Sequence, residues 1–236
     1  MKTNKKILVV LTGAGISAES GIQTFRASDG LWEGHNVMDV ATPEGWRKDR
    51  ELVLDFYNQR LRQLPTVKPN LGHLTLKELE NDLEVFIITQ NVDNLHEKAG
   101  SKNVLHLHGE LNKVRSERDK NYILDWEKDL NLGECDPNGF QLRPHIVWFG
   151  EDVPALEEAL EIVQKADFLA VIGTSLQVYP AASLMQYAAP NIPVFYIDPF
   201  PADVANPPKK LEIIPLKASE GLPLLRDRLL ALLSEE

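Results

Sequence analysis

The stretch Ile7-Leu-Val-Val-Leu-Thr-Gly-Ala-Gly-Ile-Ser-Ala18 decides the fold class, because a short apolar run leads directly into a turn of small residues. The run is almost continuously hydrophobic, which is typical of a strand buried on both faces of a parallel sheet. Gly13, Ala14 and Gly15 begin a G-x-G-x-x-A turn, whose small residues let backbone N–H groups and a helix N-terminus approach a pyrophosphate. By itself the motif fits a tight strand-to-helix turn without a ligand equally well.

Further along the chain, similar apolar runs rich in β-branched residues alternate with helical patterns. The runs that we expect to form strands are Glu84–Thr89, Asn103–Leu107, His145–Phe149, Asp167–Ile172 and Pro193–Ile197. The helices that we expect are one capped by Thr42 with Pro43 at its first position and running towards Leu64, one from Pro154 to about Lys165, and one after Ser219. This alternation predicts an α/β fold built on a parallel, Rossmann-like sheet.

Two segments interrupt the alternation of strands and helices. Residues 29–70 show a helical pattern without a strand, and residues 113–143 are polar, with Asn, Asp and Gly scattered through them. We therefore expect a single domain over residues 1–236 that carries a smaller inserted domain. The Rossmann-like part covers approximately residues 1–28, 71–112 and 144–236, and the small domain approximately residues 29–70 and 113–143.

Composition and charge argue against several classes of protein. The 236 residues include 25 Lys and Arg against 35 Asp and Glu, a net charge of −10, which disfavours direct binding to nucleic acid or to an anionic membrane. With 43% hydrophobic residues the chain is expected to bury a core, yet no run approaches the roughly 20 apolar residues of a membrane span. The apolar run behind the basic N-terminus is too short for a signal peptide. Because Cys135 is the single cysteine, no internal disulfide can form, and a reducing, cytoplasmic location is expected.

Two groups of polar residues follow predicted strands, at the edge where an open α/β sheet binds its ligands. Gln90-Asn91-Val92-Asp93 comes directly after one strand, and His106-Leu107-His108-Gly109 ends the next. The alternation places the two histidines on one face, and a histidine beside a polar crevice is a candidate general base. Capping of the next helix by Asp93 and Asn94, and a structural role for either histidine, stay open as alternatives. A dehydrogenase would need an acidic residue on a second strand about 20 residues after the glycine turn, and here the chain continues as a loop.

Six motifs occur in a fixed order along the chain. They are Gly13-Ala14-Gly15-Ile16-Ser17, Gly21-Ile22-Gln23-Thr24-Phe25-Arg26, Thr89-Gln90-Asn91-Val92-Asp93, His106-Leu107-His108-Gly109, Val147-Trp148-Phe149-Gly150-Glu151 and Gly173-Thr174-Ser175. The series covers nearly the whole chain and resembles that of the sirtuins, the NAD-dependent protein lysine deacylases. It looks closest to the bacterial and mitochondrial subgroup that removes acidic acyl groups. The resemblance implies a sirtuin-like fold in which NAD and an acyl-lysine peptide meet in the cleft between the two domains.

The resemblance implies NAD as the cofactor and assigns residues to it. The implied cofactor-binding residues are Gly13, Ala14, Gly15, Phe25 and Arg26 on the diphosphate and nicotinamide-ribose side, Gln90, Asn91 and Asp93 at the nicotinamide, and Gly173, Thr174 and Ser175 on the adenosine side. Sirtuins usually carry Asn near position 198, at the adenosine ribose, whereas this chain has Asp198. A carboxylate can accept hydrogen bonds from both ribose hydroxyls and would repel a 2′-phosphate, so NAD binding is expected to persist.

The reaction that the resemblance implies uses the acyl oxygen of the modified lysine as the nucleophile. That oxygen attacks C1′ of the nicotinamide ribose as nicotinamide leaves, and His108 then acts as the base on a ribose hydroxyl. Asn91 and Asp93 complete the implied catalytic set, and the products are free lysine, nicotinamide and O-acyl-ADP-ribose. The peptide would lie by strand addition along Val147, Trp148, Phe149 and Gly150. The alternatives are an NAD glycohydrolase or ADP-ribosyltransferase, and a non-catalytic module that binds NAD or acyl-peptides.

A candidate pocket for the acyl group lies on the helix after Thr42. Tyr57 and Arg60 are three residues apart, which puts a hydroxyl and a guanidinium on one helical face, where they can clamp a carboxylate. Without the resemblance, a surface Tyr and Arg on an amphipathic helix would be the commoner interpretation. With it, Tyr-x-x-Arg matches the succinyl- and malonyl-preferring subgroup, and the small Ala27 leaves room for a longer acyl chain. Removal of acetyl groups is expected to continue alongside.

The chain departs from most sirtuins at the structural zinc site. Ser116, Asp119, Cys135 and Asn138 stand where the family has four cysteines. One thiolate with Asp and Asn is a poor zinc ligand set, so we expect no metal. A small apolar cluster is expected to stabilise the segment instead, formed by Tyr122, Ile123, Leu124, Trp126, Leu130 and Leu132.

Overall fold

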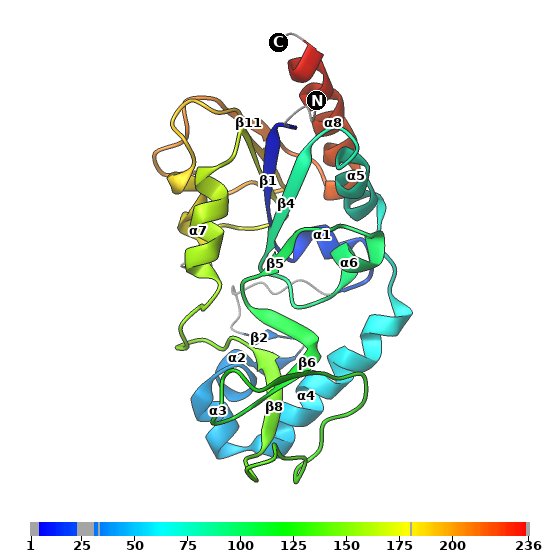
Figure 1. Ribbon diagram of the computed structural model, residues 1–236, viewed down its shortest axis with the longest axis vertical. Coiled ribbons are helices and arrows are strands. Elements are labelled where there is room, and N and C mark those ends of the chain that lie inside the picture. The colour runs from blue at the N-terminus through cyan, green and yellow to red at the C-terminus, as the bar shows by residue number, and fades with distance from the viewer. Residues whose placement is uncertain (1–4, 23–30, 33, 180, 235–236) are drawn as a thin grey trace.

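The computed structural model describes residues 5–22, 31–32, 34–179 and 181–234. Its main element is a six-stranded sheet in which every neighbouring pair of strands is parallel (Figure 1). The strands lie in the order β11 (Leu211–Ile214), β10 (Val194–Ile197), β9 (Phe168–Ile172), β1 (Ile7–Thr12), β4 (Glu84–Thr89) and β5 (Val104–His106). The chain moves outward from β1 in one direction and from β9 in the other. The strand order therefore reverses between β1 and β9, which makes this pair the switch point of the sheet.

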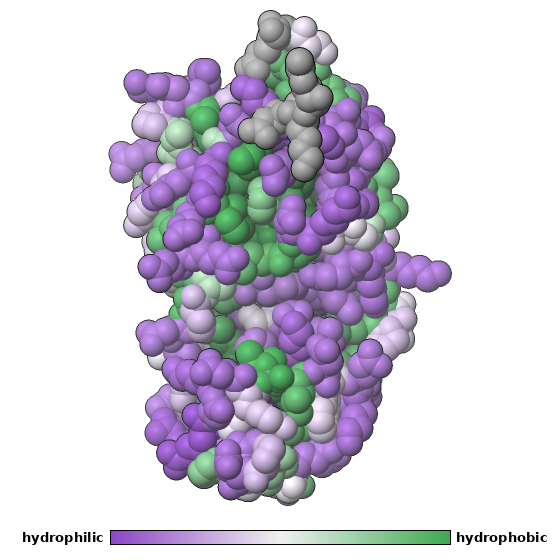
Figure 2. All heavy atoms as spheres, viewed as in Figure 1, coloured by the Kyte–Doolittle hydropathy of each residue, from purple (hydrophilic) through white to green (hydrophobic). Residues whose placement is uncertain are grey.

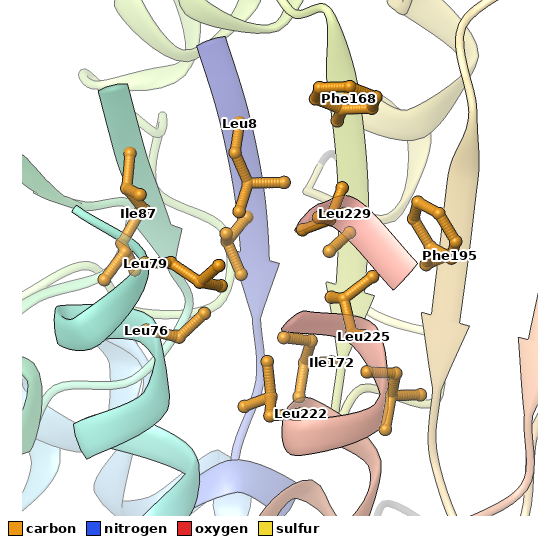
Figure 3. Close-up of a cluster of buried hydrophobic side chains, with 14 of the residues drawn as sticks. Leu8, Leu76, Leu79, Ile87, Phe168, Ile172, Phe195, Leu222, Leu225 and Leu229 are labelled. Atoms are coloured by element: carbon orange, nitrogen blue, oxygen red, sulfur yellow. The ribbon is translucent and has the colours of Figure 1, made fainter. Parts of the chain in front are cut away.

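Helices cover both faces of this sheet, and the alternation of side chains along β1 shows why. Leu8 and Val10 pack in one apolar cluster with α5 (Leu71–Leu79) and α8 (Ala218–Ser234). Figure 3 shows Leu8 among the leucines of these two helices. Val9 and Leu11 point the other way, into a second cluster with α7 (Leu156–Gln164) and η2 (Ala181–Tyr187). Successive residues of a strand face opposite sides, so a sheet covered twice needs continuously apolar strands. The first apolar run of the sequence is confirmed as such a strand.

A second, smaller sheet is antiparallel and has the order β7 (Ile123–Asp125), β6 (Gly109–Ser116) and β8 (Leu142–Ile146). The prediction that His145–Phe149 is a strand of the parallel sheet is wrong, because this part of the chain belongs to β8 or to the turn after it. A short apolar run indicates a buried strand, but it does not say which neighbour the strand pairs with. Here the neighbour is β6, which starts at Gly109, the last residue of the motif His106-Leu107-His108-Gly109.

The predicted helix from Pro43 towards Leu64 is interrupted. The structure has α3 (Pro43–Lys48) and α4 (Arg50–Gln63), followed by η1 (Leu64–Thr66). Thr42 caps α3 by accepting a hydrogen bond from Gly45 N at 3.0 Å, as expected. Asp49 leaves helical geometry and caps α4 by accepting from Leu52 N at 3.0 Å. The segment before α3 forms two short strands, β2 (Leu31–Trp32) and β3 (His35–Asn36), and α2 (Val37–Val40), where no strand was expected.

The segment that carries zinc in most sirtuins is held by a different set of contacts. Leu130 is buried in an apolar cluster with side chains of α4, β6 and β8, and the partly buried Tyr122 and Trp126 pack against this cluster. The prediction is wrong for the other three residues, because the side chains of Ile123, Leu124 and Leu132 are exposed. Polar contacts hold the segment instead.

Asp136 is the centre of these polar contacts. Its Oδ1 accepts hydrogen bonds from Asn138 N at 2.8 Å and from Phe140 N at 3.0 Å. The nearby Ser116 hydroxyl and these backbone N–H groups lower the pKa of Asp136. Cys135 is exposed beside it. Within the described ranges, no three His, Cys, Asp or Glu side chains come together as metal ligands, and the residues at the four family positions do not fit zinc.

Hydrophilic residues cover most of the face in Figure 2, with apolar residues in patches between them. No helix in the described part of the chain combines the length and apolarity that crossing a membrane requires.

Candidate active site

Two turns of small residues meet at the switch point of the sheet. Gly13 N donates to Ile172 O at 3.0 Å, and Gly15 N donates to Gly173 O at 2.8 Å. Gly173 has a φ of +62°, and a Cβ at this position would lie 2.4 Å from Ile16 N, so only glycine fits. The helix behind the first turn, α1 (Gly15–Ala18), has only 4 residues. The close approach of the two turns, rather than a long helix, therefore shapes this edge of the sheet.

A cavity of about 560 Å³ opens beside these turns, between the two sheets. It brings together almost all the predicted site residues that the structure describes. They are Gly13, Ala14, Gly15, Tyr57, Arg60, Gln90, Asn91, Asp93, His108, Val147, Trp148, Phe149, Gly150, Gly173, Thr174, Ser175 and Asp198. Phe25, Arg26 and Ala27 lie outside the described residues.

The loop after β4 forms one wall, and Asn91 is bound on three sides. Its backbone N–H donates to Thr89 Oγ1 at 3.0 Å, and its side-chain Nδ2 donates to Gly13 O at 3.1 Å and to Ser17 Oγ at 3.2 Å. Gln90 Nε2 donates to Thr174 Oγ1 across the cavity at 3.3 Å. The amide groups of the loop are therefore oriented by the two small-residue turns.

Asp93 is buried, and both its oxygens accept hydrogen bonds from the protein. Oδ1 accepts from Leu95 N at 3.0 Å, and Oδ2 accepts from Ser17 Oγ at 3.0 Å. Helix capping is therefore part of its role, since it caps α6 (Leu95–Ala99), whereas Asn94 makes no capping bond. Burial raises the pKa of Asp93, against the effect of these hydrogen bonds. Ser17, fully buried between Asn91 and Asp93, is a site residue that we did not predict, although its position in the G-x-G-x-S turn marked it.

The two alternating histidines bind successive carbonyl groups of this loop. His108 Nδ1 lies 3.0 Å from Gln90 O, and His106 Nδ1 lies 2.9 Å from Asn91 O. Because a carbonyl only accepts, Nδ1 of His108 carries a proton and its Nε2 is left with a basic lone pair. Burial lowers the pKa of His108, so the neutral form is favoured. The next residue, Gly109, must be glycine, because its φ is +81° and a Cβ would lie 1.9 Å from His145 O.

Tyr57 and Arg60 both reach the cavity from α4. The Tyr57 hydroxyl accepts a hydrogen bond from Trp148 Nε1 at 3.0 Å, and burial raises its pKa, so its own proton stays available for donation. The Arg60 guanidinium carbon lies 3.2 Å from the centre of the Phe56 ring, and Nη1 donates to Phe56 O. The cavity wall here thus carries one neutral donor and one cationic donor on one helical face.

Of the strand edge and turn expected here, the structure has the turn at Phe149 and Gly150, while Val147 and Trp148 follow the end of β8. Val147 N donates to His108 O at 2.9 Å, Trp148 N to Glu151 Oε2 at 2.9 Å, and Phe149 N to Ala41 O at 3.0 Å. These three N–H groups are engaged within the protein, so a peptide that lay along the turn would have to pair with other groups.

A buried ion network holds this turn in place. Glu151 accepts from Arg143 Nη1 at 2.8 Å and from Arg115 Nη2 at 3.0 Å. The Arg143 guanidinium carbon lies 3.2 Å from the centre of the Trp148 ring. Burial would raise the pKa of Glu151, but hydrogen bonding to Arg143 keeps it below the ordinary value. This network connects the turn to Tyr57 through Trp148, and no local sequence pattern predicted it.

Two facing small-residue turns at the switch point of a parallel sheet, with amide, carboxylate and imidazole groups around one cavity, define a dinucleotide-binding α/β protein. Residues 13–180 match the Sir2 family, and the chain belongs to this sirtuin family. It is similar to the NAD-dependent protein deacylase of Helicobacter pylori, with 56% identity over 229 residues that cover 97% of this chain and 100% of the relative.

Two solved structures show the same likeness. The chain is similar to a Sir2 homologue in complex with ADP-ribose, with 39% identity, a TM-score of 0.85 and coverage of 98% of this chain and 95% of the other. It is also similar to a Sir2 homologue in complex with NAD, with 40% identity, a TM-score of 0.84 and coverage of 95% of this chain and 89% of the other.

Proposed function

We propose that the protein is an NAD-dependent protein lysine deacylase. The observation that carries the proposal is the tautomer of His108, whose Nδ1–H is fixed on Gln90 O while Nε2 keeps its lone pair in a cavity of dinucleotide size. A module that only binds NAD has no need of such a base. The activity of the relative from Helicobacter pylori supports the same function.

The residues of the cavity fit NAD. Backbone groups of the two small-residue turns can approach a diphosphate closely, because Gly13, Gly15 and Gly173 carry no side chain. Gln90, Asn91 and Asp93 present amide and carboxylate groups to a ribose or carboxamide on the other wall. Asp198 lines the far part of the cavity, and its Oδ1 accepts from Phe200 N at 2.8 Å. A carboxylate there suits a ribose diol and repels a phosphate group.

When bound, NAD supplies an electrophilic ribose carbon with nicotinamide as its leaving group. The work left to the protein is to orient the ribose and to take a proton from one of its hydroxyls. Asn91 and Asp93 are fixed by Gly13 and Ser17 for the first task, and neutral His108 suits the second. Because its pKa is lowered, His108 remains an available base at neutral pH.

We further propose that the acyl group removed is preferentially acidic, as in succinyl- or malonyl-lysine. Tyr57 and Arg60 support this preference, since a neutral O–H and a guanidinium can bind one carboxylate between them. The surrounding wall is apolar, which strengthens a charge-assisted hydrogen bond. An acetyl group lacks the carboxylate and would use only the apolar part of the pocket.

The direct test measures nicotinamide release from NAD with and without an acyl-lysine peptide, for the wild-type protein and for His108→Tyr. We expect release only when peptide is present, formation of O-acyl-ADP-ribose, and loss of both in the variant while NAD still binds in calorimetry. Nicotinamide release without any peptide would instead identify a glycohydrolase. Binding of NAD with no turnover of acetyl or succinyl peptides would identify a non-catalytic module.

A further inference from the structure

His106 lies between two hydrogen-bond acceptors. Its Nδ1 is 2.9 Å from Asn91 O, and its Nε2 is 2.9 Å from Glu97 Oε1 on α6. A carbonyl and a carboxylate can only accept, so each ring nitrogen needs a proton, and the ring is an imidazolium. The side chain is only 7% exposed, so this charge lies inside the protein, next to the cavity wall.

The charges around the ring favour the same form. The groups that interact with its charge are Glu97 and His96 on α6, Glu110 on β6 and Asp93 on the loop after β4, while Lys113 on β6 interacts with Glu97. Burial alone would lower the pKa of His106, but the hydrogen bond and charge of Glu97 raise it above the ordinary value. The pKa of Glu97 is lowered, although burial opposes this, because of the same contact.

The imidazolium of His106 interacts with Asn91 and Asp93, the two residues proposed to orient the ribose. It binds the Asn91 carbonyl, whereas the Asn91 side chain is bound to Gly13 and Ser17. It also favours the ionised form of Asp93, whose burial otherwise favours the protonated form. Loss of the Nε2 proton would place a lone pair against the Glu97 carboxylate and break the link between the loop and α6.

We propose that His106, held as a cation by Glu97, is a positioning residue that fixes the Gln90–Asp93 loop for the NAD-dependent reaction. The proposal rests on the proposed function for its effect on turnover. Its physical core, the charge on His106, stands independently of that function. The two histidines therefore differ in charge: His108 is neutral and acts as the base, and His106 is positively charged and holds the loop in position.

The first test is a titration by long-range ¹H–¹⁵N NMR of the histidine rings, with His106→Gln used to assign the signals. We expect His106 to carry protons on both nitrogens below a midpoint that lies above 6.5, and Glu97→Gln to lower that midpoint by about one to three pH units. The exposed Glu157→Gln on α7 should leave it unchanged. A midpoint at or below 6.5, or one that Glu97→Gln does not move, would overturn the proposal even if the protein turned over no peptide.

The second test is the pH dependence of kcat/KM for NAD at saturating acyl-peptide. The wild type should show an acid limb from His108 and a basic limb from His106. Glu97→Gln should shift only the basic limb to lower pH, and Glu157→Gln should shift neither. A basic limb that stays in place in Glu97→Gln would refute a positioning role. Loss of activity at every pH with an unchanged profile would assign Glu97 a merely structural role and contradict the proposal as well.

Discussion

Replacing Arg60 by Met removes the cationic donor from the proposed acyl pocket but keeps a side chain of similar length on α4. Arg60 is 9% exposed, so its guanidinium acts in a setting where water screens it little. A charge-assisted hydrogen bond pair to a carboxylate there is worth about 3 kcal/mol. At about 1.4 kcal/mol per factor of ten, kcat/KM for a succinyl-lysine peptide should fall about 100-fold. The acetyl-lysine peptide should change less than about threefold, because it has no carboxylate to lose.

The matched control for this change is Arg62→Met on the same helix. Arg62 is exposed and pairs with Asp129 at the surface, so its contribution to either reaction should be small. The assay follows both peptides by mass spectrometry over a range of concentrations, at one fixed NAD concentration. Equal losses for the two peptides in Arg60→Met would show that Arg60 only supports the fold of α4, and the reasoning about the acyl pocket would be refuted.

Three further changes test other parts of the account. Trp148→Phe removes the Nε1–H that donates to the Tyr57 hydroxyl, so kcat/KM for the succinyl peptide should fall about fivefold to tenfold. The acetyl peptide should lose less, and equal losses for the two peptides would contradict this role of Trp148. The free energy of unfolding in urea should decrease as the pH falls from about 6.5 towards 4, because burial lowers the pKa of His73 to about 4 and the unfolded chain therefore binds the proton first. His73 alone should account for a loss of about 3 kcal/mol, and a free energy that stays constant between pH 6.5 and 5 would refute this. Asp136→Ala should lower the same free energy by about 2 kcal/mol, while EDTA leaves the wild type unchanged; a melting temperature that EDTA lowers would show that a metal stabilises the segment.

Local sequence patterns predicted most strands of the parallel sheet, but they did not predict which strand each one pairs with. The continuous hydrophobicity of β1, β4, β9 and β10 reflects burial on both faces, which depends only on the strand itself. Leu211–Ile214 was missed because it is a short edge strand with Glu212 in its middle. β8 belongs to the antiparallel sheet because it pairs with β6, which ends more than 20 residues earlier. The hydrophobicity of β8 itself does not indicate so distant a partner.

The same distinction holds for the site. Motifs on single turns, such as Gly13–Gly15 and Gln90–Asp93, were found because each is complete within a few residues. The contacts that orient them were not, because they join distant segments: the bond between Tyr57 and Trp148 spans 91 residues. The break at Asp49 was also missed. Asp favours helix caps, but one Asp within a helical pattern does not by itself end the helix, and only its capping bond from Leu52 N shows that a new helix begins.

The central claim is that this chain uses NAD to remove acyl groups from lysine and favours acidic ones. The most direct measurement incubates the purified protein with an equimolar mixture of matched succinyl-lysine and acetyl-lysine peptides, with and without NAD, and follows both by mass spectrometry. The account predicts that conversion requires NAD, that the succinyl peptide is consumed first at low concentration, and that nicotinamide and O-succinyl-ADP-ribose appear in equal amounts. Faster conversion of the acetyl peptide, or conversion without NAD, would contradict it.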